Sequence, residues 1–80
     1  MPEEILFKTE EQRTRAEIAE ALTAAADQIE SGAVHLESDT EDRDVNVPEN
    51  SRFEVELERL TDSETGEERY ELEYEIRWTK

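Results

Sequence analysis

Strict alternation between bulky apolar and charged side chains marks the C-terminal stretch RYELEYEIRWTK, residues 69–80. Its apolar residues are Tyr70, Leu72, Tyr74, Ile76 and Trp78, and the residues between them are glutamate or arginine. The upstream stretch FEVELERL, residues 53–60, begins with the same alternation. A period of two is typical of a β-strand with one buried and one solvent-facing side. The two stretches therefore predict a pair of amphipathic strands.

A turn between these stretches predicts that the two strands form an antiparallel hairpin. The connecting segment TDSETGEE, residues 61–68, is rich in turn-forming residues. We predict a register in which Arg59 pairs with Tyr70. Its apolar pairs are Leu57–Leu72, Val55–Tyr74 and Phe53–Ile76, and its acidic pairs are Glu58–Glu71, Glu56–Glu73 and Glu54–Glu75. Like charges directly opposite one another destabilise a strand pair, so this outer face is held against electrostatic repulsion.

An amphipathic helix is predicted upstream of the strands. Its apolar stripe has spacings of four, three and four residues and consists of Ile18, Leu22, Ala25 and Ile29. The sequence TEEQ predicts a capping box, with Thr9 as the N-cap and Gln12 reaching back to it, so that the helix begins at about Glu10. Gly32 supplies the C-terminal stop.

Beyond this helix the apolar pattern changes to a period of two. Val34 and Leu36 begin a strand, and the cluster SDTED at 38–42 predicts a turn. Val45 and Val47 then form the returning strand. The sequence thus predicts a second, shorter hairpin directly after the helix.

The predicted elements define an α+β fold of two layers. One amphipathic helix is expected to pack on one side of an antiparallel β-sheet meander of about four strands. Residues 5–7 are expected to pair at an edge of the sheet. Residues 1–80 are expected to form a single domain, because no linker or low-complexity segment interrupts the chain.

The small size of the chain predicts self-association. A single core in 80 residues supplies only about 3–5 kcal/mol of stability. Strands that leave an edge or an apolar face uncovered can add buried area by pairing with a second copy. We therefore expect a homodimer, and an additional protein partner is compatible with the same surfaces.

The charge balance excludes two classes of partner. Asp and Glu number 24 against nine Lys and Arg, which gives a formal net charge of −15. Nucleic acid and anionic membrane surfaces would both repel such a chain. Only two lysines are present, Lys8 and Lys80. This acidic, lysine-poor composition resembles that of haloarchaeal proteins, which work in molar KCl, and it predicts folding that is strengthened by salt.

Cysteine usage and the N-terminus bear on the compartment. The chain has no cysteine, which removes disulfides and thiolate metal sites. The beginning MPEEILFKTEE carries two glutamates where a signal peptide would carry basic residues, and no apolar run reaches membrane-spanning length. A soluble cytoplasmic protein is the expectation.

Five segments occur in an order that is similar to a known family. They are RAEIAEALTAAADQIESG, VHL, VNVP, FEVELERL and YELEYEIRW, the last ending in Trp78. In this order they resemble the amphi-Trp domain family, named for amphipathic C-terminal strands that end in tryptophan. The resemblance covers nearly the whole chain and implies a small stand-alone α+β domain common in haloarchaea. It implies no activity, cofactor or functional residue.

The segment ESDTEDRD is the strongest candidate for binding a ligand. It gathers Glu37, Asp39, Glu41, Asp42 and Asp44, and hard cations bind clustered oxygen ligands. It lacks the central glycine and the twelfth-position glutamate of an EF-hand loop, so a solvated acidic turn is the preferred interpretation. His35 is the only histidine and is interpreted as a surface or edge residue, because a multi-histidine site has no second member.

No catalytic, cofactor-binding or metal-ligating residue is predicted. Glutamate pairs are too abundant to be informative, and a single-layer sheet with one helix has little room for a pocket that shifts a pKa. We expect a non-enzymatic interaction or structural module of a high-salt cytoplasm that self-associates. The alternative is a small-ligand or cation-binding accessory protein that uses the acidic turn or a pocket between helix and sheet.

Trp78 is predicted to fasten the end of the last strand. It shares the apolar side of the alternation, where a large aromatic ring can offset the fraying of a chain end. The competing interpretation is an exposed hot spot for a partner, since tryptophan is enriched at such positions.

Overall fold

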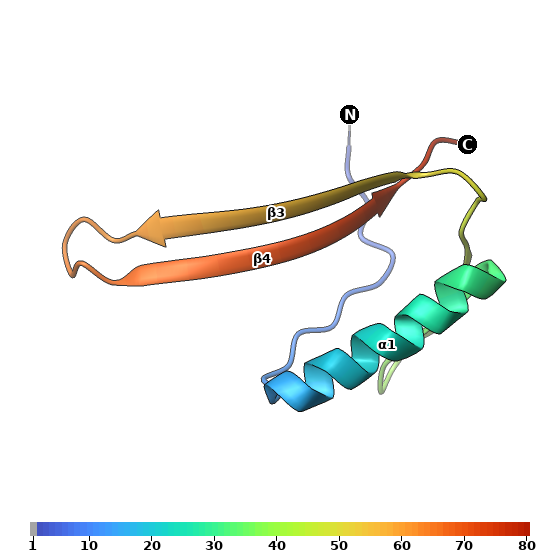
Figure 1. Ribbon diagram of the computed structural model, residues 1–80, viewed down its shortest axis with the longest axis horizontal. Coiled ribbons are helices and arrows are strands. Elements are labelled where there is room, and N and C mark those ends of the chain that lie inside the picture. Colours follow the sequence, from blue (N-terminus) through green and yellow to red (C-terminus); the bar gives the residue numbers. More distant parts are fainter. Residues whose placement is uncertain (1) are drawn as a thin grey trace. The chain divides into compact units, whose positions relative to one another are not determined.

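One helix and four strands make up the computed structural model, which describes residues 2–80 (Figure 1). The elements are α1 (Arg15–Ser31), β1 (Ala33–Glu37), β2 (Asp42–Asn46), β3 (Arg52–Thr61) and β4 (Glu68–Arg77). β1 pairs with β2 and β3 pairs with β4, both antiparallel, as two sheets of two strands. The predicted α+β class is confirmed, and the strands follow one another in the predicted order. The described residues contain no helix that is long and apolar enough to cross a membrane.

The chain divides into two compact units, which are described separately. The first ends at Val47 and holds α1 and the β1–β2 hairpin. The second, Pro48–Lys80, is the β3–β4 hairpin with its flanking residues.

The N-terminus of α1 lies five residues later than predicted. Thr14 is the N-cap: its hydroxyl oxygen accepts a hydrogen bond from the backbone N–H of Glu17 at 3.2 Å. The Glu17 carboxylate accepts one in return from the backbone N–H of Thr14 at 2.9 Å, which completes a capping box. The predicted cap at Thr9 is therefore wrong. Residues 10–13 are Glu, Glu, Gln and Arg, and they offer no apolar side chain that could pack and hold another turn of helix.

The C-terminus of α1 ends as predicted, at Gly32. This glycine has φ 96° and lies in the left-handed region, which a residue with a Cβ atom adopts only with strain. Its N–H donates to the carbonyl oxygens of Gln28 at 3.1 Å and Ile29 at 3.0 Å. These bonds satisfy carbonyl groups that the end of the helix would otherwise leave unpaired.

Half-buried apolar side chains join the end of α1 to the short hairpin. They are Ala25, Ile29, Val34, Leu36, Val45 and Val47. α1 packs against β1, and the side-chain oxygen of Gln28 accepts a hydrogen bond from the backbone N–H of His35 at 2.7 Å. The helix thereby supplies an acceptor to the outer edge of β1, which a short edge strand would otherwise expose to water.

The expected edge strand at residues 5–7 does not form. These residues have no strand conformation. The Nε of Arg43 on β2 donates a hydrogen bond to the carbonyl oxygen of Leu6 at 3.1 Å. The apolar residues Ile5, Leu6 and Phe7 are consecutive, so they have no alternation that would specify a register, and a side-chain donor from β2 bonds to the segment instead.

The long β3–β4 hairpin has the predicted register. Arg59 pairs with Tyr70, and the apolar and acidic pairs follow in the predicted order along two strands of ten residues each. On the apolar side the rings of Phe53 and Tyr74 stack, with centroids 6.3 Å apart. The turn is held by the Asp62 carbonyl oxygen, which accepts the N–H of Gly66 at 2.9 Å, and Gly66 has φ 77°.

The capping box makes Thr14 the more important of the two candidate caps. We expect Thr14→Ala to lower the free energy of unfolding by about 1 kcal/mol, because the N–H of Glu17 loses its acceptor. Thr9→Ala is the matched control and should leave stability unchanged. Denaturant melts followed by circular dichroism measure both. A larger loss in Thr9→Ala than in Thr14→Ala would contradict the observed helix start.

The same box predicts an acid dependence. Hydrogen bonds from Thr14 lower the pKa of Glu17 below its ordinary value of 4.5. A carboxyl whose pKa is lower in the folded state contributes stability above its unfolded pKa and loses it as pH falls through the folded pKa. The wild-type chain should therefore lose stability as pH falls below 4.5. Glu17→Gln should lose less over the same range, because it has no carboxyl at this position. An unchanged pH profile in the variant would contradict this assignment.

Candidate functional site

The apolar side of the β3–β4 hairpin is open to solvent. We define the apolar face as Phe53, Val55, Leu57, Tyr70, Leu72 and Tyr74, whose exposed fractions run from 53% to 71%. Alternation along both strands and the register of the ladder bring these six side chains to one side. No residue from 2 to 80 is fully buried. The six side chains of the apolar face are therefore not covered by a core of the described residues.

The opposite side of the same hairpin is acidic. We define the acidic face as Glu54, Glu56, Glu58, Glu71, Glu73 and Glu75, which form three directly opposed pairs. Arginine relieves the repulsion at the ends of this face. Arg77 lies 3.1 Å from both Glu54 and Glu75, and Arg69 lies 3.8 Å from Glu71. The two ends of the face are therefore partly neutralised.

Glu56 stands at the centre of this repulsion. The neighbouring charge of Glu54, followed by that of Glu73, raises the pKa of Glu56 above its ordinary value of 4.5. A raised carboxyl pKa means that the fold disfavours the charged form. The contribution of Glu56 to stability is therefore fully present below pH 4.5, and it is lost as pH rises through the raised folded pKa.

Trp78 follows directly after β4. Its exposed fraction is 40%, the lowest among the large apolar residues that remain exposed. The ring is thus partly covered and partly open. The clasp that we predicted for Trp78 requires a buried ring, and it stays a prediction.

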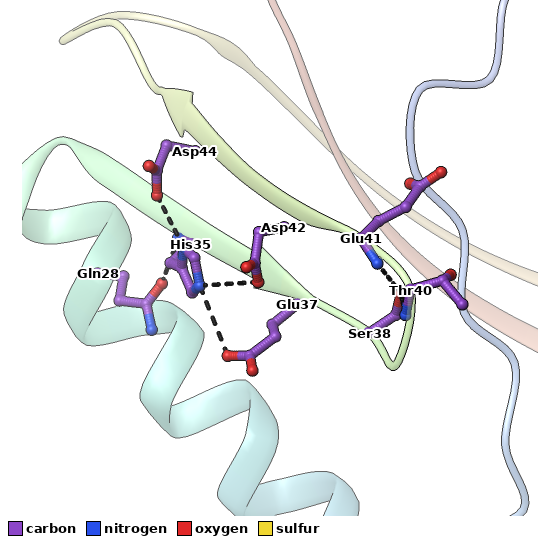
Figure 2. A network of polar contacts seen from close by, with 8 residues as sticks. All are labelled: Gln28, His35, Glu37, Ser38, Thr40, Glu41, Asp42 and Asp44. Carbon is purple, nitrogen blue, oxygen red and sulfur yellow. Dashed lines mark hydrogen bonds and ion pairs between the residues drawn. The ribbon is translucent and has the colours of Figure 1, made fainter.

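A second group of side chains converges on the polar side of the short hairpin (Figure 2). His35 and Glu37 alternate with Val34 and Leu36 on β1, and the ladder places Asp44 opposite His35 and Asp42 opposite Glu37. We call His35, Glu37, Asp42 and Asp44 the histidine cluster. The Nδ1 of His35 lies 2.7 Å from a carboxylate oxygen of Asp44, a hydrogen-bond distance. Its Nε2 lies 3.5 Å from Glu37 and 3.6 Å from Asp42.

Hydrogen bonding in the ladder explains why these side chains meet. The backbone N–H of His35 donates to Gln28 instead of β2, so His35 and Asp44 form a non-hydrogen-bonded pair. In antiparallel sheets the side chains of such pairs lie closer together than those of hydrogen-bonded pairs. The hydrogen bond with Asp44 raises the pKa of His35 above its ordinary value of 6.5, and the charges of Asp44, Asp42 and Glu37 act in the same direction.

The acidic turn that the sequence singled out is divided by the fold. Glu37, Asp42 and Asp44 join the histidine cluster, whereas Asp39 and Glu41 do not. Figure 2 shows the Glu41 side chain directed away from His35. Within the turn, the hydroxyl oxygen of Ser38 accepts the backbone N–H groups of Thr40 at 3.3 Å and Glu41 at 3.0 Å.

His35 was expected to be a surface or edge residue, and the structure groups it with the carboxylates. The available signal was the spacing of charged residues at alternate positions 35 and 37 and again at 42 and 44. On two strands joined by a short turn, alternate positions share a face. The partner of each charged residue depends on the β1–β2 register, and the sequence predicted a register only for the longer β3–β4 hairpin.

Comparison with known families identifies the chain as a whole. A model of the Amphi-Trp domain matches residues 1–80, so the chain belongs to the Amphi-Trp domain family. The match confirms the family that the sequence resembles. Comparisons with curated proteins and with solved structures found no significant match. The family match assigns no activity to either the apolar face or the histidine cluster.

Removing one central charge from the acidic face should stabilise the hairpin. We expect Glu56→Gln to raise the denaturant midpoint at neutral pH and low salt, because it relieves repulsion from Glu54 and Glu73. The gain should shrink in about 2 M KCl, where charges are screened beyond roughly 3 Å. It should also shrink as pH falls through the raised folded pKa of Glu56, and it should be absent below pH 4.5, where the charged form no longer contributes.

A matched control separates this local effect from net charge. Glu64→Gln removes the same charge from the turn between β3 and β4, outside the acidic face. An equal midpoint shift in Glu64→Gln and Glu56→Gln would contradict the assignment to opposed pairs and would point to the overall charge instead.

Proposed function

We propose that this Amphi-Trp chain is a non-enzymatic self-association module of a high-salt cytoplasm. Two copies bury the apolar face of the β3–β4 hairpin against one another. The observation that carries the proposal is the alignment of six large apolar side chains that remain more than half exposed. Exposed apolar surface of this kind marks an interaction site, because burying it on a partner releases water and lowers the free energy of the system.

A second copy is a suitable occupant for chemical reasons. The apolar face contains hydrocarbon and aromatic side chains from both strands, so it is complementary to itself around a twofold axis. A two-stranded hairpin is marginal in water by itself and gains stability when its apolar face packs on another layer. The tyrosines Tyr70 and Tyr74 add large contact area at low cost in side-chain entropy.

The placement of charge favours packing through faces over pairing through strand edges. When two hairpins pack through their apolar faces, the acidic faces point outward on opposite sides. The sheets then lie about 10 Å apart. Adding a strand at an edge would instead bring two rows of glutamates into one continuous surface, about 5 Å apart. The net charge of −15 makes that arrangement the less stable one.

High salt is the solvent that suits this arrangement. Repulsion between exposed charges extends over roughly 10 Å at 0.1 M ionic strength and only about 3 Å at 1 M. Two chains of charge −15 therefore associate more readily in concentrated KCl. The same condition strengthens apolar contacts where the salt is excluded from the protein surface.

The proposal gives the chain no catalytic role. Five of the six glutamates of the acidic face are exposed and Glu54 is half-buried, so water solvates most of this charge. General acid–base catalysis needs a carboxyl held in a site that matches its pKa to the reaction. In the acidic face the carboxylates instead keep one side of the ribbon hydrated while the other side packs.

We expect a particle of twice the chain mass of 9.3 kDa in about 2 M KCl. Sedimentation equilibrium or light scattering over a wide concentration range measures it. Leu57→Glu should weaken the dimer by more than about tenfold, because a carboxylate would have to lose its hydration in the apolar face. A 9.3 kDa particle at every concentration would overturn the proposal.

The control for the added charge is Ser63→Glu. Ser63 lies in the turn between β3 and β4, away from both faces, and the substitution adds the same negative charge. Equal weakening in Leu57→Glu and Ser63→Glu would mean that net charge, and not the apolar face, governs association. Circular dichroism of both variants shows whether the hairpin is retained.

A further inference from the structure

The histidine cluster has the form of a metal site. We propose that Nε2 of His35 and one carboxylate oxygen each from Glu37 and Asp42 bind a divalent first-row transition metal ion such as Zn²⁺. Asp44 acts as a positioning residue, because it bonds to the opposite nitrogen of the imidazole ring. One donor atom from each of the three proposed ligands lies within 4.8 Å of the others (Figure 2).

The distances within the cluster suit an ion placed between the side chains. The 3.5 Å and 3.6 Å separations of His35 Nε2 from Glu37 and Asp42 are too long for good hydrogen bonds. Nitrogen and oxygen ligands lie about 2.0–2.1 Å from zinc, and at the tetrahedral angle two such ligands are about 3.3 Å apart. The cluster is therefore close to the ligand spacing that the ion requires, and small side-chain rotations complete it.

The contact with Asp44 prepares the ring for metal binding. An ionised carboxylate only accepts hydrogen bonds, so the 2.7 Å contact requires Nδ1 of His35 to donate to Asp44. In the neutral ring this leaves the lone pair on Nε2, the atom that faces Glu37 and Asp42. A metal-ligating histidine commonly has such a partner, which fixes both the tautomer and the ring orientation.

Regular secondary structure supports the three ligands. All of them lie on β1 or at the start of β2, and their spacing follows from the ladder. The backbone of His35 is also tied to α1 through Gln28 at 2.7 Å. The exposed fractions are 48% for the His35 side chain and 70% for Glu37 and Asp42, so an ion reaches them from solvent. Remaining coordination positions are open to water.

The ligand set selects the class of ion. An imidazole nitrogen favours zinc, copper, nickel and similar ions, whereas magnesium and calcium prefer all-oxygen sites. The participation of His35 therefore distinguishes this site from general counterion binding by an acidic surface. Counterion binding would depend on total charge and would treat Asp39 and Glu41 like Glu37 and Asp42.

Calorimetric titration with Zn²⁺ and with Mg²⁺, at about pH 8, above the ordinary histidine pKa of about 6.5, tests the site. We expect one Zn²⁺ per chain and much weaker binding of Mg²⁺. Asp44→Asn should weaken Zn²⁺ binding by about 10–100-fold, and His35→Gln should weaken it further. Glu41→Gln is the matched control, since it removes a charge from the same turn outside the cluster, and its affinity should equal that of the wild type.

Nitrogen NMR of the His35 ring gives a readout that does not depend on a variant. Zn²⁺ should shift the Nε2 resonance of the wild-type chain, and Asp44→Asn should change the tautomer balance before any metal is added. Circular dichroism establishes that each variant is folded. The proposal is overturned if Zn²⁺ leaves Nε2 unshifted, if Mg²⁺ binds as tightly as Zn²⁺, or if Glu41→Gln loses as much affinity as His35→Gln.

Discussion

An amphipathic ribbon of two ten-residue strands governs the physical behaviour of this chain. Because side chains alternate along a strand, Glu54, Glu56 and Glu58 on β3 and their partners on β4 are forced onto one side. The apolar residues between them are forced onto the other side. The ribbon can relieve the exposure of the apolar side by packing, but it cannot relieve the charge of the acidic side in the same way. Solvent, partner and pH therefore act on the two sides separately.

The electrostatic arrangement shows how the protein tolerates this separation. Arg77 contacts Glu54 and Glu75, and Arg69 contacts Glu71, so basic side chains stand at the ends of the acidic face. The centre has only like charges around Glu56, whose pKa is raised as a result. Concentrated salt would supply the screening that a few arginines do not. A strongly acidic surface and a solvent of high ionic strength are consistent with one another for this reason.

The first unit uses the same alternation on a smaller scale and with a different outcome. Val34 and Leu36 on β1 are half-buried, and the alternate residues His35 and Glu37 belong to the histidine cluster. α1 contributes to both sides of this arrangement, through the apolar Ile29 and through the hydrogen bond from His35 to Gln28. A hairpin of five-residue strands thus obtains an ordered polar face because a helix satisfies its outer edge.

The amino-acid sequence by itself determined the α+β class, the helix end at Gly32, both hairpins and the register of β3–β4. These follow from local rules: an apolar period of two in the strands, a glycine after the helix, and turn-forming residues between the strands. The helix start was decided by structure, because TEEQ and TRAE satisfy the same capping consensus and the hydrogen bonds of the capping box form at the second. The histidine cluster was also decided there, because the partners of His35 depend on the β1–β2 register and on Gln28, seven residues away along the chain. Contacts between separate elements set the partners of His35, and a pattern within one element does not contain that information.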